Sequence, residues 1–329
     1  MKKILFGILV GIVLIYFSIR GVDFGEVIAS FNSVNYIFLA PALLLSLLIP
    51  LIRSLRWGVL LAPLETISQK RLFPITCIGY MAITVLPLRT GEIVRPYLVS
   101  LKKEIPMSSA LGTIVFERLL DMLMALVLLA FVIFNATLPQ WVTKFGYSLF
   151  ISFAILLPFI CLLYYKRELN MRFFGFIMKK FPERFKIKIE SLVRDFVEGF
   201  VVLGSFKRFI YALLLTIMNW GFAGLGVYAL FSFYNLELPL IAAFAVLVII
   251  AMGISLPAAP GFIGNFQFAC IVALSIFGVS KTDALGFSLI YYLLGMGLNI
   301  FLGLLFLPFI EFPFKDIFNK MAFFKKEIR

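Results

Sequence analysis

Residues 107–134 read MSSALGTIVFERLLDMLMALVLLAFVIF, an apolar run that contains Glu117, Arg118 and Asp121. The run is long enough to cross the hydrocarbon core of a bilayer as a helix. An ionisable side chain at that depth costs about 2.5–3.5 kcal/mol on insertion scales, so such residues are rare and usually mark a pathway or a site. On a helix the two carboxylates share one face with the guanidinium beside them. The stretch therefore predicts a membrane helix that handles a charged group.

The whole chain has the composition of a membrane protein. It is 62% hydrophobic with 39 Phe and has a mean hydropathy of +1.06, whereas soluble domains are about 45–50% apolar. Several apolar runs reach the length of a span, and no polar stretch is long enough for a separate catalytic domain. We expect an all-α polytopic membrane protein in which residues 1–329 form a single integral membrane domain.

The chain contains no histidine, and its three cysteines lie far apart. The lack of histidine excludes Ser-His-Asp and Cys-His nucleophile pairs and disfavours zinc and haem sites. Cys77, Cys161 and Cys270 lie in apolar runs, so we interpret them as small buried hydrophobes rather than a redox pair. No cofactor is expected. Basic loops beside anionic lipid account for the net charge of +13, so no nucleic acid partner is expected.

About six full transmembrane helices are predicted from the apolar runs. The candidate spans are residues 4–19, 36–52, 109–134, 145–165, 209–233 and 285–310. The remaining apolar segments are shorter or interrupted by Pro and Gly, and we interpret them as two re-entrant hairpins. Their legs are residues 72–88 and 93–101 in the first hairpin, and 239–256 and 262–278 in the second. Full crossing by these short segments is the alternative that the sequence leaves open.

The distribution of basic residues predicts the orientation. With both termini in the cytoplasm, Lys and Arg concentrate on the cytoplasmic side, apart from Arg20, Lys144 and Lys281 outside and Arg118 within the membrane. The basic N-terminus and the apolar run 4–19 lack an Ala-x-Ala cleavage site, which favours an uncleaved first span over a removed signal peptide. The expected location is the cell (inner or plasma) membrane, with a multi-pass chain.

Between two predicted spans, residues 166–208 are rich in Lys and Arg. Apolar side chains recur there at helical spacing, at Phe185, Ile189, Leu192, Val193, Phe196 and Phe200. This pattern is typical of an amphipathic helix that lies in the cytoplasmic interface. A solvated linker with a membrane-facing stripe is the simpler interpretation, and a gate or a lipid-recruiting element is the alternative.

Two halves of the chain, about 36–134 and 209–310, share a weak but ordered pattern. Leu86-Pro-x-x-x-Gly91-x-Ile93 recurs as Leu256-Pro-x-x-x-Gly261-x-Ile263, and Ala110-Leu-Gly112 recurs as Ala284-Leu-Gly286. On the predicted topology the two Leu-Pro turns enter the membrane from opposite faces. Such inverted repeats, with Pro- or Gly-broken segments at matching positions, point to a transporter binding site at the repeat interface. Chance matching in Leu-rich sequence is the alternative to duplication.

A second charged cluster, Arg89, Glu92 and Arg95, follows the Pro-containing turn of the first hairpin. Arginine can grip phosphate oxygens with two parallel N–H groups, so we predict a headgroup site there. The alternative is an Arg–Glu network that fixes the hairpin. The three ionisable residues of 107–134 can likewise form either a headgroup site or a structural ionic network. In the first case, a carboxylate that is not paired with arginine contacts a cationic headgroup or carries a proton.

Arg53 and Arg56 are secondary candidates. They fall at the cytoplasmic end of a predicted span, where long cationic side chains commonly reach out to the interface. Trp57 beside them is interpreted as an ordinary interface anchor.

Four motifs follow one another along the chain. They are Arg53-Ser-Leu-Arg56-Trp57, Pro87-Leu-Arg89-Thr-Gly91-Glu92-x-x-Arg95, Glu117-Arg118-x-x-Asp121 and Pro257-x-x-Pro260-Gly261-x-x-Gly264. In this order they resemble the motifs of the lysylphosphatidylglycerol synthase transmembrane (flippase-like) family, and the resemblance covers residues 4–310. That family includes the lipid-translocating half of the multiple peptide resistance factor, which is thought to move aminoacylated phosphatidylglycerol between leaflets. The chain resembles a stand-alone member without the cytosolic aminoacyl-transferase domain, so the resemblance implies translocation rather than synthesis.

One segment departs from the family pattern. Many members read Pro-Gly-Gly-x-Gly-x-x-Glu, whereas residues 260–267 read PGFIGNFQ, with an amide in place of the carboxylate. Asn265 and Gln267 can still hydrogen-bond a polar headgroup. Together with Pro260 and Gly261, they are predicted to meet the cargo from the second hairpin.

The residues and the resemblance together predict a lipid translocase, not an enzyme, that moves a polar-headgroup phospholipid or glycolipid between leaflets. Membrane lipids, among them anionic and aminoacylated phospholipids, are the expected partners, and a homo-oligomer is compatible with the chain. One rival interpretation is a membrane-embedded lipid-modifying enzyme with Glu117 or Asp121 as general base. The other is a structural subunit of an envelope-assembly complex. The lipid, the direction of transport and any coupling ion stay open.

Overall fold

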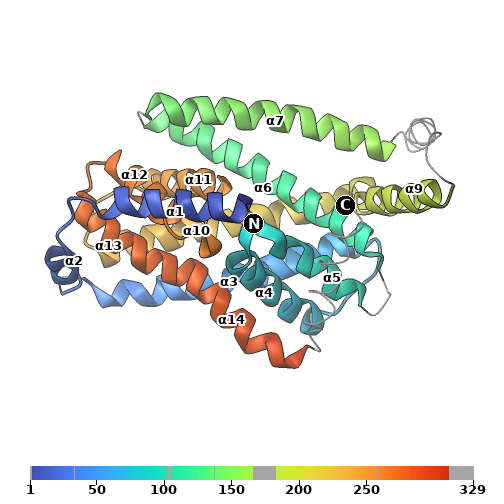
Figure 1. Cartoon of the computed structure of the whole chain (residues 1–329), viewed down its shortest axis with the longest axis horizontal. Helices are drawn as coiled ribbons and strands as arrows, with labels where there is room; N and C mark the ends of the chain where they lie inside the picture. Colours follow the sequence, from blue (N-terminus) through green and yellow to red (C-terminus); the bar gives the residue numbers. More distant parts are fainter. Residues whose placement is uncertain are drawn as a thin grey trace.

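The computed structural model describes residues 2–32, 34–101, 105–136, 138–165, 183–256 and 258–310. This described part of the chain consists of helices joined by turns, with no strand. Many of the helices run roughly along the long axis of the molecule (Figure 1). The predicted all-α fold is confirmed.

The long helices coincide with the predicted spans. They are α1 (Lys2–Ile19), η1 (Tyr36–Phe38) with α3 (Leu39–Leu61), α6 (Met107–Asn135), α7 (Gln140–Tyr165), α10 (Phe206–Phe233), and α13 (Lys281–Tyr292) with α14 (Leu298–Phe306). A π-helical segment, η6 (Leu293–Gly297), joins α13 to α14, and the 3₁₀ turn η7 (Leu307–Phe309) follows. The short helix α2 (Phe24–Ser30) follows α1 at a bend of 77°.

By length and composition, four helices in the described residues can cross a membrane: Tyr36–Leu61, Gln140–Tyr165, Phe206–Phe233 and Lys281–Phe309. The bent pair of α1 and α2 makes a fifth candidate, so the described residues contain four or five candidate spans where the sequence predicts about six. The helix α6 is 29 residues long and carries the ionisable residues. Large apolar side chains are widely exposed on the helices, among them Phe150 and Phe159 of α7. Exposed apolar surface of this extent fits a lipid surrounding.

The first predicted hairpin is formed by two helices and a tight turn. The helix α4 (Gln69–Val85) ends at Leu86, the 3₁₀ segment η2 (Pro87–Ile93) turns the chain, and α5 (Val94–Ser100) packs against α4. Leu86 has an extended backbone, with φ −81° and ψ 138°. Pro87 then opens η2, where a missing N–H loses no helical hydrogen bond.

Gly91 is required by the packing of this hairpin. The turn passes so close to α4 that a Cβ on Gly91 would overlap backbone atoms of Ala82 and Ile83. Gly91→Ala is therefore expected to destabilise the protein by about 1–3 kcal/mol, because backbone cannot move aside as a flexible side chain does. Thermal unfolding in detergent measures the effect. Gly221→Ala is the control, since its added Cβ meets nothing within 4 Å, and equal melting temperatures for the two variants would contradict the packing argument.

The second hairpin has the same order of elements. It comprises α11 (Leu240–Ser255), η5 (Pro260–Phe262) and α12 (Asn265–Ser275), and Pro257 lies outside the described residues. Gly264 has a φ of 89°, a value that favours glycine. A Cβ at this position would also overlap a backbone carbonyl of α1. The helix α1 thus packs directly on the second hairpin.

The two halves of the chain pack against each other reciprocally. Within this arrangement α3 lies against α10, α4 lies against α14, and α11 lies against α6, so the leading leg of each hairpin contacts the last helix of the other half. The turns η2 and η5 also touch. Figure 1 shows the first hairpin in the half of the molecule that holds α9, and the second in the half that holds α2. The inverted relation of the halves stays a prediction, and this reciprocal packing supports it.

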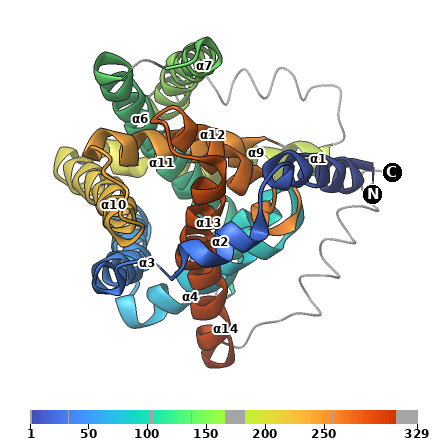
Figure 2. The ribbon, with the colours of Figure 1, turned by 90° about the vertical axis from the view of Figure 1, so that its left-hand side faces the viewer.

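Viewed along the long axis, α3 lies beside α10, and α7 lies at the periphery (Figure 2). Among the described elements, α7 makes its main contacts with α6 and α9. Its exposed apolar side chains therefore follow from its position at the edge of the bundle.

The amphipathic segment is integrated into the core more closely than its pattern suggests. Residues 166–182 lie outside the described residues, and α9 (Glu183–Glu198) packs against α6. Phe200, just after α9, is fully buried. The backbones of Gly112 and Gly199 come so close that a Cβ on either would overlap the other chain segment. The interpretation as a membrane-facing stripe is thus wrong for Phe200, because this close approach draws it into the core.

Candidate functional site

Glu117 on α6 is the centre of a buried ionic cluster. Its side chain is fully buried, and its two carboxylate oxygens accept from both Nη groups of Arg95 on α5, at 3.1 and 3.2 Å. Its Oε1 also accepts from Nη2 of Arg118 at 2.8 Å and from the Tyr80 hydroxyl at 3.1 Å. Nη2 of Arg56 lies 3.2 Å from the same oxygen. One carboxylate therefore joins α3, α4, α5 and α6.

Asp121, one turn further along α6, organises the other side of the cluster. Arg56 on α3 donates to both of its oxygens, at 2.7 and 3.2 Å, and also donates to the Thr216 hydroxyl on α10 at 3.1 Å. Trp220 of α10 donates its indole N–H to Oδ1 at 3.4 Å. Nη1 of Arg118 lies 3.4 Å from Oδ2. These contacts tie α3 and α10 to α6.

Aromatic rings cover the guanidinium groups. The guanidinium of Arg95 lies 5.1 Å from the Trp57 ring and 4.8 Å from the Tyr80 ring, and that of Arg53 lies 4.3 Å from Tyr80. Cation–π contacts of this kind stabilise a desolvated cation by up to about 2 kcal/mol. The rings therefore help to hold the buried guanidinium of Arg95 and the partly exposed one of Arg53.

Arg56 and Trp57 are buried within the protein, contrary to the interpretation that these side chains reach out to the membrane interface. Their relative exposures are 1% and 0%, and the Trp57 indole donates to the Thr113 hydroxyl at 3.1 Å. The reason is the length of α3, which continues to Leu61 rather than ending near residue 52. Both side chains consequently project into the core from the last two turns of a packed helix.

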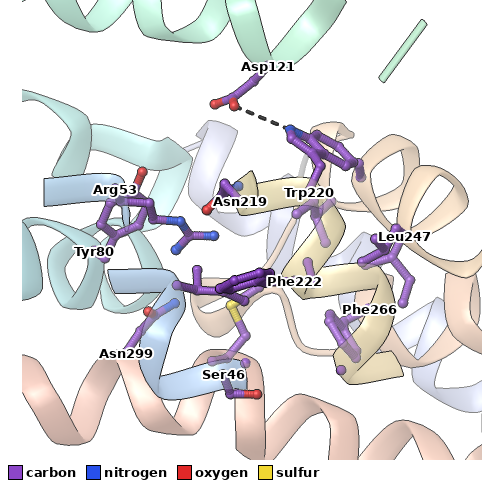
Figure 3. A pocket seen from close by; sticks show the side chains of 18 of the residues that line it. Ser46, Arg53, Tyr80, Asp121, Asn219, Trp220, Phe222, Leu247, Phe266 and Asn299 are labelled. Carbon is purple, nitrogen blue, oxygen red and sulfur yellow. Dashed lines mark hydrogen bonds between the residues drawn. The ribbon is translucent and has the colours of Figure 1, made fainter. Parts of the chain in front are cut away.

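A cavity of about 740 Å³ adjoins the cluster (Figure 3). Its polar lining consists of Ser46, Arg53, Tyr80, Glu92, Arg118, Asp121, Asn219, Trp220, Ser255, Tyr291 and Asn299. Most of the remaining lining is apolar and comes from α3, α6, α10, α11 and the α13–η6–α14 helix. The side chains of Arg118 and Asp121 are 36% and 19% exposed, whereas those of Arg56, Arg95 and Glu117 are at most 1% exposed. Two of the five ionisable groups thus face the cavity, and three are enclosed by the cluster.

The structure brings most of the predicted charged residues together. Arg56, Arg95, Glu117, Arg118 and Asp121 form the cluster, and Arg53 and Glu92 line the adjoining cavity. The side chain of Arg89 lies outside the described residues. The two charged motifs of the sequence therefore meet at one place because the first hairpin packs against α6.

Asn265 and Gln267 bond to the backbone of their own hairpin. Oε1 of Gln267 accepts the N–H of Gly264 at 2.8 Å, and Nδ2 of Asn265 donates to the Gly253 carbonyl at 3.1 Å. Among the described residues that line the cavity, neither amide is included. In this conformation the two amides therefore do not make the direct contact with cargo that the sequence predicts.

Pro260 and Gly261 likewise build the turn η5 rather than the cavity lining described above. The Gly261 carbonyl accepts the Tyr292 hydroxyl at 2.8 Å, which fastens the turn to α13. From the second hairpin, Phe266 of α12 reaches the cavity, together with Leu247, Ile250, Ala251, Ile254 and Ser255 of α11. These residues therefore position Phe266 on the cavity wall.

Several polar residues of the site escape prediction from the sequence, among them Tyr80, Thr216 and Asn219. Thr216 and Asn219 are three residues apart in the apolar span 209–233. Polar residues that share a helix face within a span were the signal that could have found them. Tyr80 gives no comparable signal in a chain with 12 Tyr.

The described ionisable groups leave the site with one net positive charge. In the cluster, Arg56, Arg95 and Arg118 outnumber Glu117 and Asp121 by one. On the cavity wall, one further arginine and one further glutamate balance each other. Within the described residues, no group of three His, Cys, Asp or Glu could hold a metal ion. The arrangement is suited to contact with a charged polar group by hydrogen bonds and electrostatic attraction.

The fold and the site together define a helical polytopic membrane protein with a buried ionic cluster beside an internal cavity. Residues 4–303 match the family described as the lysylphosphatidylglycerol synthase TM region, and the chain belongs to that family. The resemblance noted from the sequence motifs is therefore confirmed.

Two similar proteins come from archaea. A UPF0104 membrane protein of Methanothermobacter thermautotrophicus is 21% identical over 320 residues, which cover 92% of this chain and 94% of the relative. A UPF0104 membrane protein of Methanocaldococcus jannaschii is 26% identical over 219 residues, which cover 64% of this chain and 86% of the relative. No solved structure matches the chain. The descriptions of these relatives indicate a membrane protein and name no activity.

Proposed function

We propose that the protein moves a polar-headgroup lipid between membrane leaflets, with the headgroup in the cavity and the acyl chains in the surrounding lipid. The observation that carries the proposal is the cavity, where Arg118 and Asp121 are partly exposed beside largely apolar walls. Ionisable residues that line a cavity inside a membrane domain commonly mark a substrate path. Its volume of about 740 Å³ lies within the range of about 300–1,000 Å³ typical of ligand sites.

The enclosed part of the cluster supports this proposal by fixing the wall behind the cavity. Arg56, Arg95 and Glu117 join the three helices α3, α5 and α6 through contacts of 3.1–3.2 Å. A polar network of this kind, when its members are paired, makes a rigid support. Arg118 and Asp121 are then held in place for a headgroup that arrives from the bilayer.

The two hairpins also support a transport role. Non-helical backbone at membrane depth is tolerated where it is buried in protein or lines a cavity. The turn η2 supplies Glu92 to the cavity wall, and it touches η5 from the other half of the chain. Broken segments that meet between two repeat-like halves are the arrangement expected of secondary transporters. Membership of a family named for a lipid synthase favours a lipid as the cargo.

The proposal also includes the location of the protein and the energy source of the transport cycle. We place the protein in the cell membrane with both termini in the cytoplasm, because this orientation satisfies the positive-inside rule. The sequence has no Walker-type phosphate-binding loop. The proposed cycle therefore runs on an ion gradient, on the lipid gradient or without energy input.

Reconstitution in liposomes tests the proposal. Purified protein is incorporated into vesicles that carry a headgroup-labelled phospholipid, and exchange between leaflets is followed by the quenching of label in the outer leaflet. Protein-dependent exchange without a change in the mass of the lipid is the expected result. A new lipid species would instead indicate a lipid-modifying enzyme. No exchange by folded protein that retains a co-purifying partner would indicate a subunit of an assembly complex.

Filling the cavity is expected to block transport. Gly295, in η6, lines the cavity, and a Cβ added there meets nothing within 4 Å. Gly295→Trp is expected to lower the exchange rate by about tenfold or more, since a bulky ring occupies the space of the headgroup, and tenfold corresponds to only about 1.4 kcal/mol. Gly221→Trp is the matched control, because its Cβ also meets nothing within 4 Å but Gly221 is outside the described cavity lining. Equal rates for both variants would argue against passage through this cavity.

A further inference from the structure

Asn219 holds an unused hydrogen-bond acceptor in the cavity wall. Its side chain belongs to α10, lines the cavity and is only 7% exposed. Among the described residues, none donates a hydrogen bond to its buried Oδ1. Because buried polar atoms are nearly always paired, this oxygen is expected to accept from a donor that is either water or a bound ligand.

This acceptor shares the space with the charged wall. Figure 3 shows Asn219 between Arg53 and Trp220. The indole N–H of Trp220, the next residue along α10, donates to Asp121, and Asp121 in turn lies 3.4 Å from Arg118. A single headgroup can therefore contact Asn219 and the charged wall together.

The net charge of the site favours a headgroup of opposite charge. Arg53 and Arg118 line the cavity, and Nε of Arg118 has no hydrogen-bond partner among the described residues. Guanidinium groups bind phosphate oxygens through paired N–H donors. The described ionisable groups carry one net positive charge, which an anionic headgroup neutralises. A headgroup with a net positive charge would increase it, and like charges repel more strongly beside low-dielectric protein than in bulk water.

We propose, on the basis of the proposed function, that the cargo is an anionic phospholipid whose headgroup carries free hydroxyl groups. The phosphate lies against Arg118 and Arg53, and a headgroup hydroxyl donates to Oδ1 of Asn219. An ammonium group could also donate to this oxygen, but it would add positive charge to a site that already has one net positive charge. Aminoacylated and ethanolamine headgroups are therefore the weaker ligands, and phosphatidic acid carries at least as much negative charge as phosphatidylglycerol without a headgroup alcohol.

Lipid binding to the purified full chain tests this assignment. Native mass spectrometry compares phosphatidylglycerol, phosphatidic acid, phosphatidylethanolamine and lysyl-phosphatidylglycerol with identical acyl chains, each added to delipidated protein in the same detergent. Phosphatidylglycerol is expected to be retained about two- to tenfold better than phosphatidic acid, the range that one net hydrogen bond provides. The two amine-bearing lipids are expected to bind more weakly still. Equal retention of all four lipids, or preference for an amine-bearing one, would overturn the proposal.

The Asn219→Leu variant tests whether the Asn219 amide causes the preference for phosphatidylglycerol over phosphatidic acid. This variant removes the acceptor at similar size, so it is expected to bind phosphatidylglycerol and phosphatidic acid equally and to bind phosphatidic acid as the unaltered protein does. Asn135→Leu is the control, since Asn135 is exposed at the end of α6, and it is expected to keep the preference. Asn219→Ala replaces the Leu variant if that one fails to fold. A preference that persists without the Asn219 amide would refute the role of this residue.

The binding experiment separates this inference from translocation. Selective binding of the hydroxylated anionic lipid by a protein that exchanges no lipid in liposomes would support the site and refute the transport cycle. Exchange that proceeds with no preference among headgroups would support transport and refute the site.

Discussion

Glu117→Gln is expected to lower the stability of the protein by about 3–5 kcal/mol, because removal of one partner leaves buried charges uncompensated. The carboxylate of Glu117 accepts both Nη groups of Arg95, which is fully buried, and lies within 3.2 Å of Arg56 and Arg118. A neutral amide of the same size keeps the packing but removes the negative charge that all three arginines share. The excess of positive charge in the cluster then rises by one.

Thermal or denaturant unfolding in detergent measures this effect, together with the yield of folded protein after purification. Glu26→Gln is the control, because Glu26 is exposed on α2, and it is expected to change little. A Glu117→Gln protein with unaltered unfolding would show that the cluster contributes no net stability.

A double substitution separates the effect of the buried charges from the effect of side-chain packing. Replacing both Glu117 and Arg95 with Met removes the ion pair and fills the site with apolar atoms of similar length. Exchange of a whole buried pair for apolar residues is often neutral or stabilising, so the double variant is expected to be more stable than Glu117→Gln alone. Additive losses from the two substitutions would instead show that the residues act independently.

Arg118→Ala is expected to abolish lipid exchange while leaving insertion and folding largely intact. Arg118 differs from the other cluster arginines because its side chain is 36% exposed to the cavity. Without it, Glu117 keeps Arg95 and Asp121 keeps Arg56, so both carboxylates retain a cation. The cavity wall, however, loses a guanidinium that faces the proposed headgroup.

The liposome exchange assay and detergent unfolding, performed on the same preparation, check this prediction. Arg118→Lys is expected to keep part of the activity, since Lys preserves the charge but not the paired N–H donors. Arg208→Ala, at the exposed start of α10, is the control for loss of a positive charge elsewhere. Unaltered exchange by well-folded Arg118→Ala protein would remove Arg118 from the mechanism.

The positions of the helices and hairpins were largely predictable from the sequence. Apolar runs of sufficient length marked the spans, and the Leu-Pro turns with Gly91 and Gly261 marked the hairpins. These signals are local, because hydrophobicity and the backbone restrictions of Pro and Gly act within a short stretch of chain. The charged residues of α6 were equally visible, since ionisable groups are rare in such a stretch.

The membership of the site was predictable only in part. Arg56 was assigned to the interface because the span was expected to end near residue 52, yet α3 continues to Leu61 and carries Arg56 into the core. Asn265 and Gln267 were assigned to the cargo, whereas their amides bond to backbone of the second hairpin. In each case the structure shows hydrogen-bond partners within the protein that the local sequence pattern did not indicate.

The sequence by itself determined a helical membrane protein with broken segments and with ionisable side chains within its spans. Only the tertiary structure decided that Glu117 and Arg95 are sealed together while Arg118 and Asp121 face a cavity beside Asn219. The physical reason is that the environment of a charge depends on helices that are distant in sequence. Which arginine reaches which carboxylate is set by how α3, α5 and α10 pack on α6, and no short stretch of chain contains that information.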